Sequence, residues 1–174
     1  MMRALKRFVL ILTAAVIFVS CGKSEELVLT EKSFFLAMTN IQLFPHKYVG
    51  KEYELDCFTY KITDVNGVDY LCGVRKCSSG YGCTCGKDTI IGFILDYNGV
   101  IPEPRNQSDN SNDKTWIHIK GRLESDEMTG VTVYAYSGDE IDYSTTEIIN
   151  FLTFKVESLN LIEDYSSLNY YVTK

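Results

Sequence analysis

The chain has 174 residues, of which 45% are hydrophobic, 13% aromatic and 23% charged, and its formal net charge is −6. This length and composition are typical of a single globular domain. The acidic balance argues against a nucleic-acid-binding protein, since contacts to phosphate need Lys and Arg, and we therefore expect no nucleic-acid partner.

The first twenty residues are predicted to be a targeting segment. Three basic residues precede an apolar run over residues 8–19, which is too short to span a bilayer comfortably. The run is followed by Ser20 and Cys21, and a small residue before a cysteine at this point resembles a bacterial lipobox. We predict a lipoprotein signal peptide over 1–20 and a lipid-anchored tether over 21–30. Plain secretion and a retained anchor are the alternatives.

Lipidation of Cys21 predicts a location in the bacterial cell envelope, either periplasmic or surface-exposed. Removal of the signal peptide takes away three basic residues and no acid, so the net charge falls from −6 to −9. The lipid, rather than a polybasic surface, then provides the membrane anchor. Five cysteines remain after Cys21, and an odd number means that at least one cannot pair within the chain.

The first element of the domain is predicted to be a helix over Glu31–Leu43. Thr30 is suited to cap its N-terminus. Phe34, Met38 and Ile41 recur at helical spacing and predict a stripe that packs on the core.

Strand patterns follow the helix, and the first of them changes phase. Its apolar residues alternate up to Cys57 and then continue from Phe58 on the other parity, which predicts a bulge. Asn66–Gly67 predicts a hairpin turn, and Thr129–Gly130 predicts another turn. The predicted strands are Glu52–Ile62, Val68–Arg75, Thr89–Tyr97, Thr115–Glu124, Val131–Tyr136 and Phe151–Ile162.

This order predicts a mainly β domain over residues 31–174. We expect a small OB-like antiparallel barrel with one N-terminal helix, a Cys/Gly-rich loop and an inserted β arm near residues 125–146. An open antiparallel sandwich is the alternative. The tail from residue 163 is predicted either to cover the barrel or to be a frayed end.

The chemistry of the chain is expected in the loop from Cys72 to Gly86, which has the cysteine spacing C-x4-C-x5-C-x-C. Converging thiolates suit soft metal ions, and zinc is the metal we favour. The predicted metal ligands are Cys72, Cys77, Cys83 and Cys85.

Two other interpretations of this loop stay open. Pairing of Cys72 with Cys83, or of Cys77 with Cys85, would close a loop and stabilise the fold by about 2–3 kcal/mol without any ligand. Alternatively, Cys83 and Cys85 form a redox-active pair.

Three residues are further candidates for the same site. Cys57 has the apolar parity of its strand, which favours a buried small side chain. His118 alternates with polar neighbours and is expected to face solvent or to line a groove. Asp88 follows Cys85 closely and is a further ligand candidate. The tyrosines and Trp116 could line a binding groove, but packing is the interpretation we favour.

The sequence predicts no catalytic site. It lacks the G-x-S-x-G, Walker, H-E-x-x-H and dinucleotide fingerprints, and its two histidines are far apart in the chain.

Most of residues 31–172 resemble the C-terminal extracytoplasmic domain of the YcgQ-like family of bacterial membrane proteins. The resemblance implies an OB-type barrel, a permease as partner and a link to metal handling. In this chain Thr84 separates two cysteines that are adjacent in the family, and a lipid anchor takes the place of transmembrane helices. The matching segments are Phe44–Lys51, Val74–Arg75, Cys83–Asp88, Ile91–Phe93, Trp116–Gly121 and Leu161–Ile162.

We therefore predict an extracytoplasmic, lipid-anchored binding module that holds a soft metal ion and assists a transporter. A structural or interaction lipoprotein with a disulfide-stapled loop is the first alternative. A thiol-redox protein is the second.

Overall fold

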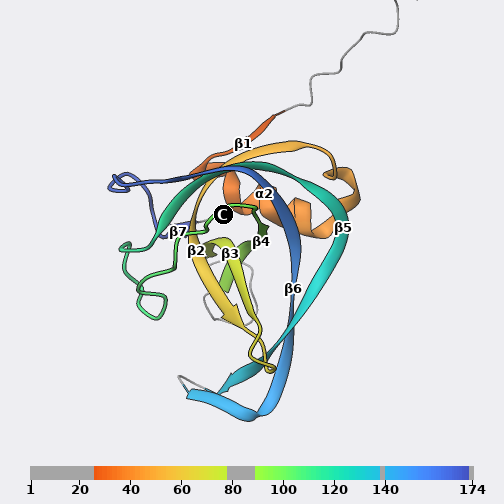
Figure 1. Cartoon of the computed structure of the whole chain (residues 1–174), viewed down its shortest axis with the longest axis vertical. Helices are drawn as coiled ribbons and strands as arrows, with labels where there is room; N and C mark the ends of the chain where they lie inside the picture. The colour runs from red at the N-terminus through yellow and green to blue at the C-terminus, as the bar shows by residue number, and fades with distance from the viewer. Residues whose placement is uncertain (1–25, 78–88, 138–139, 173–174) are drawn as a thin grey trace, which may run out of the picture.

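The computed structural model describes residues 26–77, 89–137 and 140–172, which form a mainly β fold with one α-helix (Figure 1). The described strands make one sheet in the order β1-β2-β5-β6-β4-β3-β7, and β2 also pairs with β3. Their bounds are β1 (Leu27–Leu29), β2 (Glu52–Thr63), β3 (Asp69–Cys77), β4 (Thr89–Asp96), β5 (Trp116–Ser137), β6 (Glu140–Leu161) and β7 (Tyr171–Val172).

The extra pairing closes five strands into a ring. Following neighbours from β2 leads through β5, β6, β4 and β3 back to β2. The β4–β6 pairing is parallel and the other four are antiparallel. The mainly β prediction is confirmed, whereas the OB-like barrel stays a prediction.

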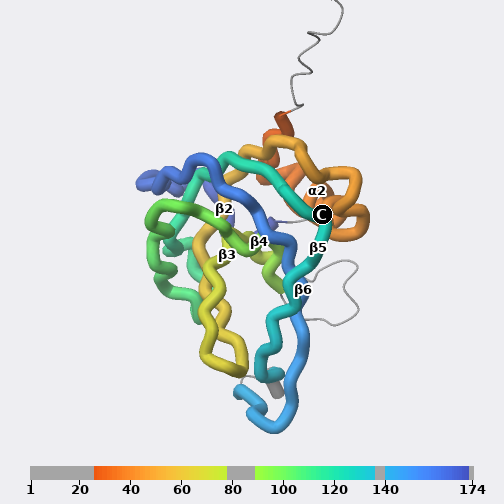
Figure 2. The backbone as a smooth tube through the Cα atoms, turned by 45° about the vertical axis from the view of Figure 1, so that its right-hand side comes forward, coloured from red at the N-terminus to blue at the C-terminus, as the bar shows by residue number. Residues whose placement is uncertain are grey.

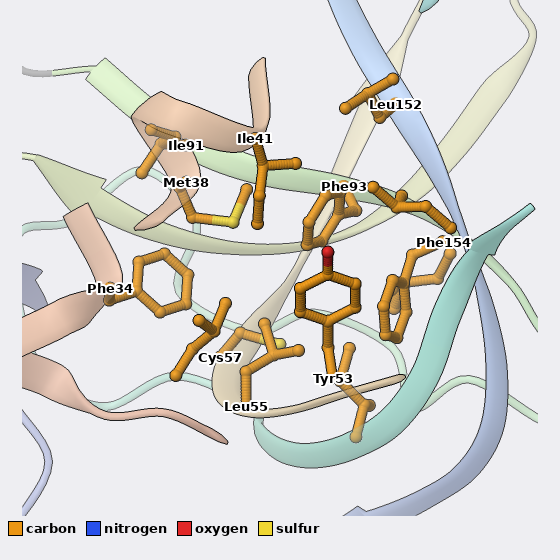
Figure 3. Packing of buried hydrophobic residues seen from close by; sticks show 14 of the residues in the cluster. Phe34, Met38, Ile41, Tyr53, Leu55, Cys57, Ile91, Phe93, Leu152 and Phe154 are labelled. Atoms are coloured by element: carbon orange, nitrogen blue, oxygen red, sulfur yellow. The ribbon is translucent and has the colours of Figure 1, made fainter. Parts of the chain in front are cut away.

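The predicted helix is confirmed as α2 (Glu31–Leu43), and η1 (Pro45–Lys47) follows it as a short 3₁₀ turn. The backbone N–H of Thr30 donates to the Ser33 Oγ at 3.0 Å, which fixes the start of α2. Phe34, Met38 and Ile41 are at most 1% exposed and point toward the sheet (Figure 3). The tether region also contributes β1, which pairs in parallel with β2.

The phase change in β2 has a different cause from the one predicted. Phe58 pairs with Trp116 of β5 and also with Val74 of β3, so β2 exchanges one neighbour for the other at this residue. Cys57 and Phe58 are both buried, but in different hydrophobic clusters. The register of both ladders is continuous, so the predicted bulge is wrong. The side of the strand that carries the buried residues changes where β2 exchanges β5 for β3 as its neighbour.

β5 and β6 form a long two-stranded arm. We call residues 124–137 and 140–152 the arm; it begins where residues 124–127 of β5 bulge out opposite Thr153 of β6. The predicted turn at Thr129–Gly130 is wrong, because both residues continue the ladder with β6. Figure 1 shows the arm reaching away from α2 and β1, which lie at the other end of the molecule.

The tail after β6 covers the ring instead of fraying. Tyr170 and Val172 are buried, and β7 pairs in parallel with β3. Among the described residues, no helix is long and apolar enough to cross a bilayer.

Candidate binding groove

A hollow with a cavity volume of about 410 Å³ lies between the β2–β3 hairpin and the arm. Figure 2 shows this hairpin running beside β5 and β6. We call the hollow the arm groove. It is lined by Tyr60, Lys61, Ile62, Thr63, Lys76, Thr89, Ile90, Gln107, Val133, Tyr134, Ile141, Glu147, Ile149 and Tyr170.

The arm groove has a framework of backbone contacts. The hairpin turn is confirmed by the N–H of Gly67, which donates to the Asp64 carbonyl at 3.0 Å. At this turn the Val65 N–H donates to the carbonyl oxygen of Thr132 in β5, also at 3.0 Å. The hairpin is therefore bonded directly to the arm beside the groove.

A loop residue and the tail complete the walls. Gln107 accepts a hydrogen bond from the Lys61 N–H at 2.5 Å through its Oε1. Tyr170, from the tail, stacks on Phe58 with ring centroids 5.3 Å apart. The groove therefore joins residues from five parts of the chain: the hairpin, β4, the loop before β5, the arm and the tail.

The chemistry of the arm groove is apolar and aromatic with charged groups at its edge. The Lys76 ammonium lies 5.4 Å from the Tyr170 ring centroid and donates to Asn110 at 2.7 Å. The Lys61 ammonium lies 3.5 Å from an Asp69 carboxylate oxygen. Pockets of this size and composition bind organic ligands, with apolar walls for burial and a few polar groups for orientation. The predicted packing is confirmed for Trp116 and Tyr170, which are buried in one hydrophobic cluster, and Tyr170 also lines the groove.

His118 is not in the arm groove but on the outer side of the β2–β5 ladder. Its Nδ1 is 2.7 Å from Asp56 Oδ1, and its Nε2 is 3.3 Å from Glu54 Oε1. Lys120 also contacts Glu54 and, at 3.1 Å, Glu26. The hydrogen bond from Lys120 lowers the pKa of the Glu54 carboxyl.

This outer cluster is a row of cross-strand charge pairs. Opposite charges facing each other across a ladder stabilise the pairing by about 0.2–1 kcal/mol each. In the part of the chain that the structure describes, no group of three or more His, Cys, Asp or Glu side chains is arranged to hold a metal ion.

Three of the candidate cysteines are core residues. Cys57 and Cys72 are both 0% exposed, and Cys77 is 3% exposed. Burial raises the pKa of the Cys72 thiol to about 12 and also raises the pKa of Cys57, so both stay protonated at neutral pH. Because a metal ligand or nucleophile must be a thiolate, these positions are poorly suited to either role.

The structure does not bring Cys72 and Cys77 together. They are five residues apart on β3, about 16 Å at 3.3 Å per residue, and they belong to different hydrophobic clusters. Cys77 ends β3 and pairs with Thr89, the first residue of β4. The remaining site candidates lie outside the described residues: Cys21, Cys83, Cys85 and Asp88.

Two buried cationic side chains were not predicted from the sequence. Arg75 is 1% exposed; its guanidinium donates to the carbonyls of Asp56 and Asn169 and lies 4.8 Å from the Trp116 ring centroid. Lys114 is also 1% exposed and donates to Asp109 Oδ1 at 2.6 Å. Arg75 holds the backbone of the tail in place, and Lys114 holds the backbone of the loop before β5.

Comparison with known proteins gives one family match. The family model described as the DUF1980 C-terminal domain matches residues 16–136. This match confirms the resemblance to the C-terminal domain of the YcgQ-like family. No curated protein and no solved structure matches the chain.

Proposed function

This chain belongs to the DUF1980 C-terminal domain family, and we propose that it acts as an extracytoplasmic binding module anchored to the membrane by a lipid on Cys21. On this proposal it holds its ligand in the arm groove and does not transform it. A membrane permease is the partner that the family resemblance favours. The chain then serves as an accessory that presents or receives the ligand at the membrane.

The observation that carries the proposal is the composition of the arm groove. Three tyrosines contribute flat apolar surface with polar ends, and Ile62, Ile90, Ile141 and Ile149 add aliphatic surface. Lys61 and Lys76 contribute two cations and Glu147 contributes one carboxylate, so the cations of the lining outnumber its anions by one. These features favour a ligand with an apolar or aromatic body and an anionic group.

The fluorescent probe 1-anilinonaphthalene-8-sulfonate has this chemistry and tests the proposal. We expect it to bind the native chain, with a fluorescence increase that saturates at about one site. Ile141→Glu places a negative charge in the groove and should weaken binding of the sulfonate probe about tenfold, since a repulsion of about 1.4 kcal/mol between like charges corresponds to that factor.

Ile148→Glu is the matched control, because Ile148 lies on the same strand, does not line the groove and is 66% exposed. It should bind the probe as the native chain does. Equal weakening in both variants, or no weakening in either, would refute a ligand site in the arm groove.

A soft metal ion is a second candidate for the bound species, with fewer coordinating cysteines than the sequence predicted. Cys57 and Cys72 are buried in the core as protonated thiols, and Cys77, which is 3% exposed, is also a core residue but ends β3, so the smaller candidate set is Cys77, Cys83 and Cys85. The position of Cys77 at the end of β3 supports this set, because the loop that carries the other two cysteines begins there. Three thiolates and one further ligand would satisfy the tetrahedral preference of zinc.

Metal and free thiols counted on the same anaerobically purified sample test this candidate. We expect about one metal ion per chain, which is lost when Cys83 and Cys85 are changed to Ser and kept when Cys72 is changed to Ala. A chain without metal and with most loop thiols oxidised would instead support the disulfide-stapled alternative. Reversible oxidation of Cys83 and Cys85 would support the redox alternative.

A further inference from the structure

The outward side of α2 carries large apolar residues. Lys32, Leu36 and Leu43 are spaced four and seven residues apart, which at 3.6 residues per turn aligns them in one stripe. This stripe lies opposite the residues that α2 buries. Leu36 is 62% exposed and Leu43 is 65% exposed. The helix already packs its other face on the core. Leucines this exposed on the remaining face are typical of a surface that contacts a partner.

The segment after α2 continues the same mixture of apolar and basic groups. Phe44 is 44% exposed and Val49 is 38% exposed. The Lys47 ammonium lies 4.6 Å from the Phe44 ring centroid, and the Lys51 ammonium lies 5.2 Å from the Tyr48 ring centroid. An aromatic ring beside an ammonium group suits the boundary between headgroups and acyl chains.

The charge of this segment differs from that of the rest of the chain. Residues 32–51 contain three lysines and no acid, whereas the whole chain has 23 acidic residues and a net charge of −6. A local positive charge on an acidic protein favours an anionic surface as the partner, and each lysine near anionic lipid contributes about 1 kcal/mol.

The position of this segment relative to the N-terminus points to a membrane. β1 starts at Leu27, so only residues 22–26 separate it from the candidate lipidation site, and these six Cα–Cα steps reach at most about 20 Å when extended. β1 and α2 share one end of the molecule, and the arm points away from that end (Figure 1). A chain held at Cys21 would bring this end close to the bilayer.

We propose that Lys32, Leu36, Leu43, Phe44, Lys47 and Val49 form a surface that rests on the anionic face of the membrane; we call it the helix patch. This goes beyond the proposed ligand site, although the orientation rests in part on the proposed anchor. Leu36, Leu43 and Phe44 enter the interfacial region while the lysines contact lipid phosphates. The arm groove is then directed away from the bilayer.

Tryptophan quenching by brominated lipid tests the helix patch in the full chain. Leu43→Trp and Ile148→Trp form a matched pair, because these positions are 65% and 66% exposed and lie on the helix patch and the arm, respectively. The native Trp116 is 0% exposed and contributes the same background to both. The vesicles contain phosphatidylglycerol and phosphatidylcholine, the latter brominated at carbons 6 and 7.

We expect quenching of the tryptophan at position 43 to exceed that at position 148 several-fold, and to decrease when Lys32 and Lys47 are both changed to Glu. Equal quenching at the two positions, or stronger quenching on the arm, would overturn the proposal and leave a protein partner as the occupant. The mass of the Cys21 peptide is measured separately. An unmodified Cys21 with selective quenching refutes the lipid anchor but supports the helix patch.

Discussion

The backbone N–H of Val65 donates a hydrogen bond to the carbonyl oxygen of Thr132, with the two atoms 3.0 Å apart. Val65 lies in the turn of the β2–β3 hairpin and Thr132 lies in the arm. Their neighbours Thr63 and Val133 both line the arm groove. This bond therefore joins the hairpin and the arm at the edge of the groove, in addition to the hydrophobic cluster that residues of both elements share.

Val65→Pro is expected to weaken probe binding to the arm groove several-fold, because it removes the N–H that bonds to Thr132. Val65 is the second residue of the hairpin turn, where proline is well tolerated, so the turn itself should persist. The lost bond is worth about 0.5–1.5 kcal/mol. Val65→Ala keeps the N–H and should bind the probe normally; if both variants bind normally, the bond does not shape the groove.

The parts of the fold that follow from local sequence patterns were predicted, and those that depend on distant contacts were not. The stripe of Phe34, Met38 and Ile41 identified α2, because a 3.6-residue period is a local signal. The arm was only partly predicted: Ser125, Asp126 and Glu127 resemble a loop, yet they bulge from a strand whose ladder continues beyond them.

The arm groove could not be predicted from the sequence. Tyr60, Tyr134 and Tyr170 come together only through the hairpin, the arm and the tail, and no spacing rule relates them. By contrast, the burial of Cys57 was predicted correctly from its strand parity. Cys72 was assigned to the metal site because of its spacing, which does not reveal that it points into the core. His118 was correctly predicted to lie outside the core, on a polar face.

Gly121→Ala is expected to destabilise the fold, whereas Gly130→Ala on the same strand should be tolerated. A Cβ at Gly121 would overlap the carbonyl oxygen of Lys155, which belongs to the backbone and cannot move aside. A Cβ at Gly130 would meet the side chain of Ile148 at 3.1 Å. We expect a loss of about 1–3 kcal/mol for the first variant and about 0.5 kcal/mol or less for the second.

Urea unfolding of the two glycine variants measures this difference. Similar stabilities would mean that β5 and β6 do not approach as closely at Gly121 as described.

Arg75→Met should destabilise the fold by about 1–3 kcal/mol and loosen the tail, because the carbonyls of Asp56 and Asn169 would lose a buried charged donor. Arg122→Met is the control. Arg122 lies on β5 and donates to Glu157 of β6 at 2.9 Å, but its side chain is 44% exposed, so water can replace this bond. Limited proteolysis should release the C-terminal segment faster from the first variant only; equal rates would contradict this role for Arg75.

The buried thiol of Cys72 predicts a loss of stability in alkali. Its pKa is raised to about 12 in the folded chain, whereas an exposed thiol has a pKa of about 8.5. Its contribution is therefore complete below about pH 8.5 and falls as the pH rises toward 12, since the unfolded chain releases the proton first. The slope for one such group is at most about 1.4 kcal/mol per pH unit.

The free energy of unfolding measured in reductant between pH 9 and pH 11 checks this expectation. The native chain should lose stability more steeply than Cys72→Ala, which lacks the titrating group. Parallel slopes would show that Cys72 ionises as easily in the folded chain as in the unfolded chain.

The central claim is that the arm groove is the ligand site, and the isoleucine methyl groups report on it most directly. The full chain, labelled at isoleucine δ1 methyls, is titrated with 1-anilinonaphthalene-8-sulfonate and followed by NMR. The account predicts progressive shifts for Ile62, Ile90, Ile141 and Ile149, with the core methyls of Ile41, Ile117 and Ile119 and the exposed methyl of Ile148 unchanged. Shifts confined to the core or to Ile148, with the four groove methyls unmoved, would contradict it.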